Sequence, residues 1–340
     1  MLRELALSEA VENLVSLDLQ ASKQASRFSK ALHSIRLIAI AWMKLFSHDL
    51  VFLNASNKRA IVSGFMLDIA CRMHRKPLVI RIFGGAFLEH IEAAPTWRQW
   101  MARRLLKRRP ILLQTRFSID RVRAAFPDAD LRWFPNSRPL QASSEADPRR
   151  PGSIERPLRF YFAGHVCADK GADLLLELAN DYEGPTIEIH LFGELLGDID
   201  RATIDRSGSA DCSLFYHGAV PNEELAEQLP EFDALLFPTR FVGEGYPGVI
   251  LEAFSHGLPV IASDWYAIPE LVDADCGALL PHDDVDSWRR CVHDLAEERE
   301  RVPALSRGAR ARIHRFDSAE WNRRRLPELL TDIMAEQNSQ

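Results

Sequence analysis

Residues 237–272 read FPTRFVGEGYPGVILEAFSHGLPVIASDWYAIPELV. The pattern predicts a buried strand, a glycine-rich loop, a helix, a second strand and a short loop. A strand that enters a glycine-rich turn before a helix builds an anion site, because backbone N–H groups and the helix dipole point to one place. Glu244 lies on this loop and Glu252 within the helix. Carboxylates accept hydrogen bonds from sugar hydroxyls, so the stretch predicts a site for a sugar joined to phosphate.

The same stretch resembles the donor-site signature of the retaining glycosyltransferases of family 4, which have the GT-B fold. The family pattern has two glutamates with seven residues between them, within E-G-aromatic-P-x-x-x-x-E-A, and this chain has EGYPGVILEA at 244–253. GLPVIAS at 257–263 and IPELV at 268–272 also match. The resemblance implies an α/β chain of GT-B architecture, in which two Rossmann-like domains with parallel sheets face a central cleft.

A second motif, GHVCADKG, occupies residues 164–171. It resembles the family's G-R-x-x-x-x-K-G, whose arginine and lysine hold the donor diphosphate. Lys170 matches, whereas His165 stands where the family has arginine. A cation there stabilises the leaving group, and a histidine could supply the charge when protonated or one hydrogen bond when neutral. The alternative for Lys170, a solvated lysine at a helix start, is disfavoured because cations are unfavourable near helix N-termini.

The resemblance also implies roles residue by residue. Glu244 would hold hydroxyls of the donor sugar, and Lys170 would act at the diphosphate. Glu252 would hold the ribose hydroxyls, its alternative being an ordinary surface position on a helix. The nucleotide's base would lie near Gly218, where FYHG resembles the family's f-x-G. Backbone and side chains around these residues would complete the donor site, which comprises Gly164, His165, Gly218, Gly245, Tyr246, Pro247, Gly248, Val249 and Glu252.

The acceptor side has fewer signals. Gly84 and Gly85 resemble the glycine pair that follows an early strand in related enzymes. His90 lies just beyond and is a catalytic candidate, although a single histidine on an early helix is more often structural. Retaining enzymes of this fold are thought to let the leaving phosphate accept the acceptor's proton, so no carboxylate dyad is required. No Asp-x-Asp motif stands in a suitable context, and we expect neither a metal ion nor a cofactor.

Length and composition predict two domains. The 340 residues are 46% hydrophobic and 26% charged, as in a globular protein. Strands alternate with helices in both halves, which predicts parallel sheets with ligands beyond the carboxyl ends of the strands. We expect an N-terminal acceptor-side domain over 1–140, a linker over 141–157 and a nucleotide-sugar-binding domain over 158–315. A final helix over 316–340 would return to the N-terminal domain, with Trp321 packed at the crossover.

The start of the chain departs from the family pattern. Residues 1–63 contain no glycine, whereas family 4 chains usually begin with a strand and a glycine-rich loop. Residues 1–13 are predicted to be helical, and residues 14–19 resemble the family's second strand. Either the chain begins inside the usual domain or its N-terminal half is a reduced variant.

Charge is distributed unevenly. Residues 1–150 carry 25 Lys and Arg against 13 Asp and Glu, whereas the remainder carries 17 against 35. The densest basic segment, Arg98–Arg109, contains Trp100 and Met101 on a predicted helix. Three interpretations remain for this segment: it binds an anionic membrane surface, it is a solvated helix packed on its own domain, or, as the least favoured, it binds nucleic acid. The five scattered cysteines predict reduced thiols, and we expect a cytoplasmic protein, with a peripheral position on the inner face of the membrane as one option.

These observations favour a retaining glycosyltransferase. It would move a hexose-type sugar from a nucleotide-sugar to a glycan or lipid-linked glycan, in cell-surface polysaccharide synthesis. Two alternatives remain: a catalytically silent GT-B protein that binds a nucleotide-sugar or a partner enzyme, and a sugar-nucleotide epimerase of the same fold. His165 and the missing glycine loop favour the silent protein, whereas Lys170 and the two glutamates oppose it.

Overall fold

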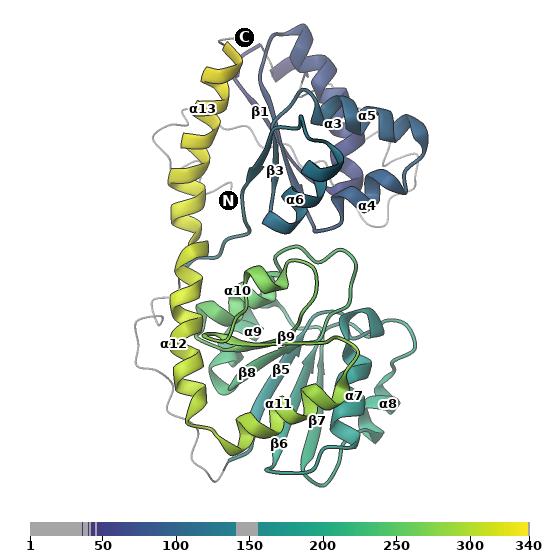
Figure 1. Ribbon diagram of the computed structural model, residues 1–340, viewed down its shortest axis with the longest axis vertical. Coiled ribbons are helices and arrows are strands. Elements are labelled where there is room, and N and C mark those ends of the chain that lie inside the picture. Colours follow the sequence, from purple (N-terminus) through teal and green to yellow (C-terminus); the bar gives the residue numbers. More distant parts are fainter. Residues whose placement is uncertain (1–35, 37–39, 41, 45, 141–155, 339–340) are drawn as a thin grey trace. The chain divides into compact units, whose positions relative to one another are not determined.

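The computed structural model of the chain describes residues 36, 40, 42–44, 46–140 and 156–338 (Figure 1). Contacts divide the chain into two compact units, one of residues up to Pro135 together with Ser318 onward, and one of Asn136–Asp317. Each unit is built around its own parallel sheet. The elements predicted over residues 1–19 and most of the predicted linker lie outside the described residues.

The sheet of the first unit has four parallel strands in the order β1-β2-β3-β4. The strands alternate with helices along the chain, as the sequence predicts, and one further helix comes from the C-terminal segment. The elements are β1 (Val51–Ser56), α3 (Asn57–Met73), β2 (Leu78–Phe83), α4 (Phe87–Glu92), α5 (Thr96–Leu106), β3 (Ile111–Leu113), α6 (Arg116–Ala125), β4 (Leu131–Trp133), the π-helical turn η6 (Glu320–Arg325) and α13 (Leu326–Asn338).

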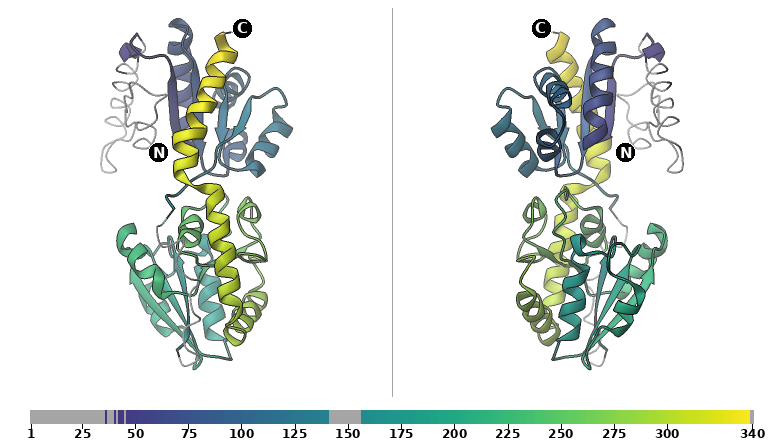
Figure 2. Two further views of the ribbon diagram at one scale, coloured as in Figure 1. Left: turned by 90° about the vertical axis from the view of Figure 1, so that its left-hand side faces the viewer. Right: turned by 90° about the vertical axis from the view of Figure 1, so that its right-hand side faces the viewer.

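Both faces of this sheet are covered. Leu78, Ile80 and Ile82 of β2 point to the core that α3, α4, α5 and α6 share. Val79, on the opposite face, packs with Leu326 and other residues of α13. Figure 2 shows α13, in yellow, beside this sheet. Side chains alternate between the faces of a strand, so the apolar run of β2 supplies both cores.

The basic helix α5 packs only part of its apolar residues. Ala102, Leu105 and Leu106 are buried in the core of the first unit. Trp97 and Trp100 are 49% and 50% exposed. The apolar residues of this helix therefore divide between the core and the surface.

The sheet of the second unit has six parallel strands in the order β10-β9-β8-β5-β6-β7. Most of its elements were predicted, but α8 and β10 were not. The elements are β5 (Leu158–Ala163), η2 (Ala168–Lys170), α7 (Ala172–Asn180), β6 (Ile187–Phe192), α8 (Arg201–Arg206), β7 (Cys212–Gly218), α9 (Asn222–Gln228), η3 (Leu229–Glu231), β8 (Ala234–Phe237), α10 (Gly248–Ser255), β9 (Val260–Ser263), η4 (Ile268–Glu270), β10 (Gly277–Leu280), α11 (Val285–Glu297), α12 (Arg301–Ile313) and η5 (His314–Phe316).

Helices cover this sheet as well. Phe160 and Ile189 belong to a core shared with α7 and α11, where Trp288 is fully buried. Helix α10 contacts β8 and β9. Four of its apolar side chains are buried, namely Ile250, Leu251, Ala253 and Phe254. The parallel arrangement brings the carboxyl ends of the strands to one edge, where ligands bind in such sheets.

Candidate functional site

Three glycines join the strand ends at the carboxyl edge of the second unit's sheet. The Gly164 N–H donates to the Phe192 carbonyl at 3.0 Å, and the Gly193 N–H donates to the Gly218 carbonyl at 2.7 Å. A Cβ on Gly193 would lie 1.7 Å from the Gly164 oxygen. Only glycine allows this approach, so the ends of β5, β6 and β7 form a continuous backbone rim.

The loop after β5 is fixed against the end of β8. Gly171 has φ +77°, and a Cβ there would lie 2.0 Å from the Pro238 carbonyl oxygen. The Arg240 N–H donates to the Asp169 carbonyl at 2.9 Å, and the Arg240 guanidinium donates to Asp173 at 2.5 Å. The Lys-Gly pair of the second motif is thereby held beside the glycine-rich loop of the first.

Lys170 and Glu244, 74 positions apart in sequence, form an ion pair. The Glu244 side chain is 7% exposed and that of Lys170 is 20% exposed. The Lys170 Nζ also lies 4.6 Å from the centroid of the Phe241 ring, a cation–π contact. The structure thus brings the two predicted catalytic residues of this unit together.

Two hydrogen bonds of Tyr246 hold the turn before α10. The Tyr246 hydroxyl donates to Glu270 at 2.5 Å, and the Tyr246 carbonyl accepts from Asn136 at 2.8 Å. Pro247 precedes the first helical residue, and no side chain caps the helix. The free N–H groups of the first turn of α10 can therefore bind an anion.

Arg138 lies beside this helix start. Its Nη2 is 2.7 Å from the place that a Cβ on Gly248 would take. A guanidinium at a helix N-terminus is unfavourable unless an anion is shared between the two. Gly248 leaves room for Arg138, which suggests why glycine stands at this position.

The remaining donor-site candidates lie on the same unit. His165 is exposed on the loop after β5, next to Gly164. Glu252 is half-buried on α10, one turn beyond Gly248 and on the same side of the helix. Gly245 and Val249 lie on either side of the Tyr246–Gly248 turn.

A histidine pair lies beside Gly218. His190 Nδ1 is 2.9 Å from His217 Nε2, and the two rings stack with centroids 5.1 Å apart. Burial lowers the pKa of His190, an effect that Glu188 opposes and His217 adds to. Burial also lowers the pKa of His217, to which the positive charge of Arg201 contributes. Both rings therefore favour the neutral form.

The acceptor-side candidates lie in the first unit. The Gly84 N–H donates to the Gln114 side-chain oxygen at 3.1 Å, and the Ser118 hydroxyl donates to the Gly85 carbonyl at 3.2 Å. His90, half-buried on α4, has Nδ1 2.7 Å from the Ala86 carbonyl oxygen. Because a carbonyl can only accept, Nδ1 carries the proton, and Nε2 is the ring atom left to act.

The described residues contain no group of three His, Cys, Asp or Glu side chains placed to hold a metal ion. Among these residues no helix combines the length and apolarity that a membrane span requires.

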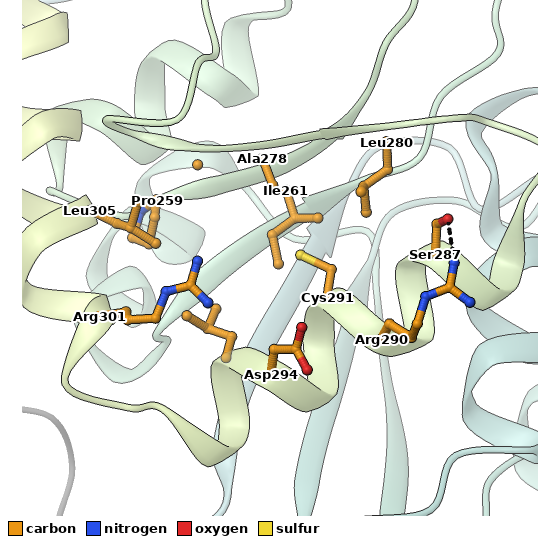
Figure 3. A pocket seen from close by; sticks show the side chains of 12 residues that line it. Pro259, Ile261, Ala278, Leu280, Ser287, Arg290, Cys291, Asp294, Arg301 and Leu305 are labelled. Carbon is orange, nitrogen blue, oxygen red and sulfur yellow. Dashed lines mark hydrogen bonds between the residues drawn. The ribbon is translucent and has the colours of Figure 1, made fainter.

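A cavity of about 290 Å³ lies between β9, β10, α11 and α12, where Arg290 donates to Ser287 (Figure 3). None of the candidate site residues lines it.

Sequence reasoning missed Phe241 and Arg138. Phe241 lies within the quoted stretch, but its contact with Lys170 depends on a loop whose path is set by Gly243, where a Cβ would lie 2.6 Å from the Phe241 ring. Arg138 lies five residues after the end of β4. A basic residue at such a place does not indicate contact with a helix 110 positions later.

Comparisons with known proteins agree with this architecture. Residues 157–298 match the family described as glycosyl transferases group 1. The amylovoran biosynthesis glycosyltransferase AmsK of Erwinia amylovora is 26% identical over 52% of this chain and 46% of its own length. The phosphatidyl-myo-inositol mannosyltransferase of Mycolicibacterium smegmatis is 30% identical over 39% of this chain and 34% of its own. The chain therefore spans less than half the length of these curated relatives.

Solved structures extend the match to most of the chain. HepE from Anabaena, crystallised with UDP, aligns with a TM-score of 0.70 at 19% identity, covering 89% of this chain and 84% of HepE. Sucrose-phosphate synthase from Thermosynechococcus elongatus aligns with a TM-score of 0.68 at 16% identity, covering 97% and 83%. The predicted fold class is confirmed. The chain has the GT-B fold, and residues 157–298 are similar to the glycosyl transferases group 1 family.

Proposed function

We propose that the protein is a retaining glycosyltransferase that moves a hexose-type sugar from a nucleotide-sugar to a glycan or lipid-linked glycan. The observation that carries the proposal is the ion pair of Lys170 with Glu244 at the carboxyl edge of the second sheet. In this proposal, Lys170 supplies a cation for the diphosphate and the neighbouring Glu244 supplies a carboxylate for sugar hydroxyls. AmsK and the O-antigen chain mannosyltransferase B of Escherichia coli, both similar to this chain, support a role in polysaccharide synthesis.

In this proposal Lys170 stabilises the negative charge that develops on the leaving diphosphate. The first turn of α10, from Gly248 and Val249, binds phosphate through its N–H groups, and Arg138 adds a second cation. Arg138 would supply the charge that the family's arginine provides and that His165 does not carry when neutral.

Glu244 would accept hydrogen bonds from the donor sugar and Glu252 from the ribose. Binding of the diphosphate would draw Lys170 away from Glu244, which frees that carboxylate for the sugar. Gly84, Gly85 and His90 would serve the acceptor. The leaving phosphate would take the acceptor's proton on the face from which it departs, and no metal ion is required in this scheme.

The test is donor turnover by the purified chain over a panel of UDP-, GDP- and ADP-sugars, with and without EDTA. Slow hydrolysis of one donor that EDTA leaves unchanged and that Lys170→Ala and Glu244→Ala abolish would support the proposal. Failure of every donor to bind would refute the donor site. Tight donor binding without transfer to any oligosaccharide acceptor would favour the silent GT-B protein, the alternative that His165 suggests.

A further inference from the structure

A cavity of about 500 Å³ lies in the first unit, where Pro77 leads into β2 and Pro110 leads into β3. The C-terminal ends of α3 and α5 form its walls, together with residues before β4 and a turn of α13. Gly84 and Gly85 follow the opposite end of β2. A six-residue strand is about 20 Å long, so the cavity is distant from the acceptor-side loop.

The cavity is strongly basic. Two of its cations are neutralised: Arg109 pairs with the buried Asp68 at 2.5 Å, and Lys76 lies 3.5 Å from Asp49. Four others form no ion pair within the part of the chain that the structure describes, and they are exposed to solvent around the opening. These four are Arg72, Arg75, Lys107 and Arg108.

The carboxylates of the cavity do not offset this charge. Asp130 and Glu336 both pair with Arg132, at 3.0 and 2.5 Å. Asp128 is the third acidic residue of the lining. Four unpaired cations therefore face one carboxylate that is not engaged elsewhere among the described residues, a balance that favours a bound anion.

Arg75 gives independent evidence. It has φ +52°, a left-handed conformation in which it ends α3. The Lys76 N–H donates to the Cys71 carbonyl at 2.8 Å, and the Arg75 N–H donates to the Arg72 carbonyl at 3.2 Å. This is the Schellman arrangement, in which glycine usually takes the left-handed position because it pays no steric cost there. Residues other than glycine are uncommon in this conformation, and strained residues cluster at functional sites.

A purely structural explanation covers only part of the set. Cations near the C-terminus of a helix interact favourably with its dipole, which accounts for Arg72 and Lys107. It does not account for Arg75, because glycine would end α3 without strain.

We propose that this basic cavity, lined by Arg72, Arg75, Lys107 and Arg108, is a binding site for a multiply charged phosphate group, separate from the donor site. Guanidinium groups match phosphate oxygens through paired N–H donors. A soluble diphosphate and a phosphorylated lipid headgroup share this chemistry. The proposal goes beyond the transferase function and does not depend on it, because all of its residues lie in the first unit.

The test is calorimetric titration of the full chain with inorganic pyrophosphate, in a Lys170→Ala background that weakens binding at the donor site. The double variant Arg75→Gly/Arg108→Ala should weaken pyrophosphate binding at least tenfold. Its matched control is Arg59→Ala/Arg103→Ala, which removes two exposed arginines of α3 and α5, the helices that Arg75 and Arg108 follow, but none from the cavity. Because Arg75→Gly relieves the left-handed strain, a melting temperature that does not fall separates lost binding from unfolding.

A vesicle experiment separates the two sources. Flotation with phosphatidylcholine vesicles containing phosphatidic acid, lost in the cavity variant and blocked by pyrophosphate, identifies a headgroup as the ligand. Pyrophosphate binding without flotation identifies a soluble phosphate. Equal weakening in the cavity variant and its control, or no binding of either probe by the chain with intact arginines, overturns the proposal.

Discussion

The carboxyl edges of the two sheets are built in different ways. In the second unit Gly193 and Gly171 are required because backbone atoms approach within 2.0 Å of the place for a Cβ. In the first unit the Gly84–Gly85 loop is held by the side chains of Gln114 and Ser118. Backbone approach fixes residue identity, whereas side-chain support can be exchanged for other side chains. The family match covers residues 157–298, which include the edge with the close backbone approaches and not the first unit.

The largest expected effect is on catalysis in the second unit. Lys170→Ala should lower kcat for transfer roughly 100- to 1000-fold, because it removes a charge that stabilises the leaving diphosphate. Steady-state transfer assays with the preferred donor measure this. Arg201→Ala, which removes an exposed cation of the same unit, serves as the control and should leave kcat unchanged. Equal losses in both variants would contradict the role of Lys170.

The next effect tests whether close backbone approach requires glycine. Gly171→Ala should destabilise the chain by about 3 kcal/mol, because the new Cβ meets Pro238 in a left-handed conformation. Gly197 is a matched control, since it has nearly the same φ, +75°, with no atom within 4 Å of its Cβ position. Gly197→Ala should cost about 1 kcal/mol. Urea unfolding measures both, and equal losses would show that the close approach to Pro238 has no energetic consequence.

His90 brings the first unit into the comparison. His90→Ala should lower transfer about tenfold and leave donor hydrolysis unchanged, because its Nε2 would act on the acceptor side. Comparing the two reactions in one enzyme preparation makes the measurement. An equal loss of donor hydrolysis would show that His90 acts on the donor and not on the acceptor.

Glu252 should affect binding more than turnover. Glu252→Gln should raise the KM for the donor about tenfold with kcat nearly unchanged, because a hydrogen bond to ribose is present before and during the reaction. Kinetics with a donor titration checks this. A fall in kcat without a change in KM would exclude the ribose assignment.

The smallest effect is on stability as a function of pH. The pKa values of His190 and His217 are lowered in the folded state, so the folded chain favours neutral rings. Their contribution is complete above the ordinary pKa of about 6.5 and is lost as the pH falls through the lowered values. Urea unfolding at pH 7.5 and 5.5 should show a smaller loss of stability in His190→Gln than in the parent chain.

The sequence predicts the second unit better than the first for a physical reason. The Lys170 and Glu244 motifs contain the glycines that hold them together, so their proximity follows from the pattern. Phe241 and Arg138 could not be predicted, because their contacts depend on how a loop and a segment pack in space. The edge strand β10, Gly277–Leu280, was missed because its sequence GALL contains no β-branched or aromatic residue, the types that favour strands.

The glycine rim has a consequence for altering the specificity of the protein. Libraries that randomise Gly164, Gly171 or Gly193 would consist mainly of misfolded chains, whatever substrate is sought. Diversity belongs instead at exposed side chains on the same edge, such as His165 and Phe241, where change alters the surface presented to a ligand without moving the backbone. The scaffold thus separates positions that preserve the fold from positions where new selectivity can be acquired.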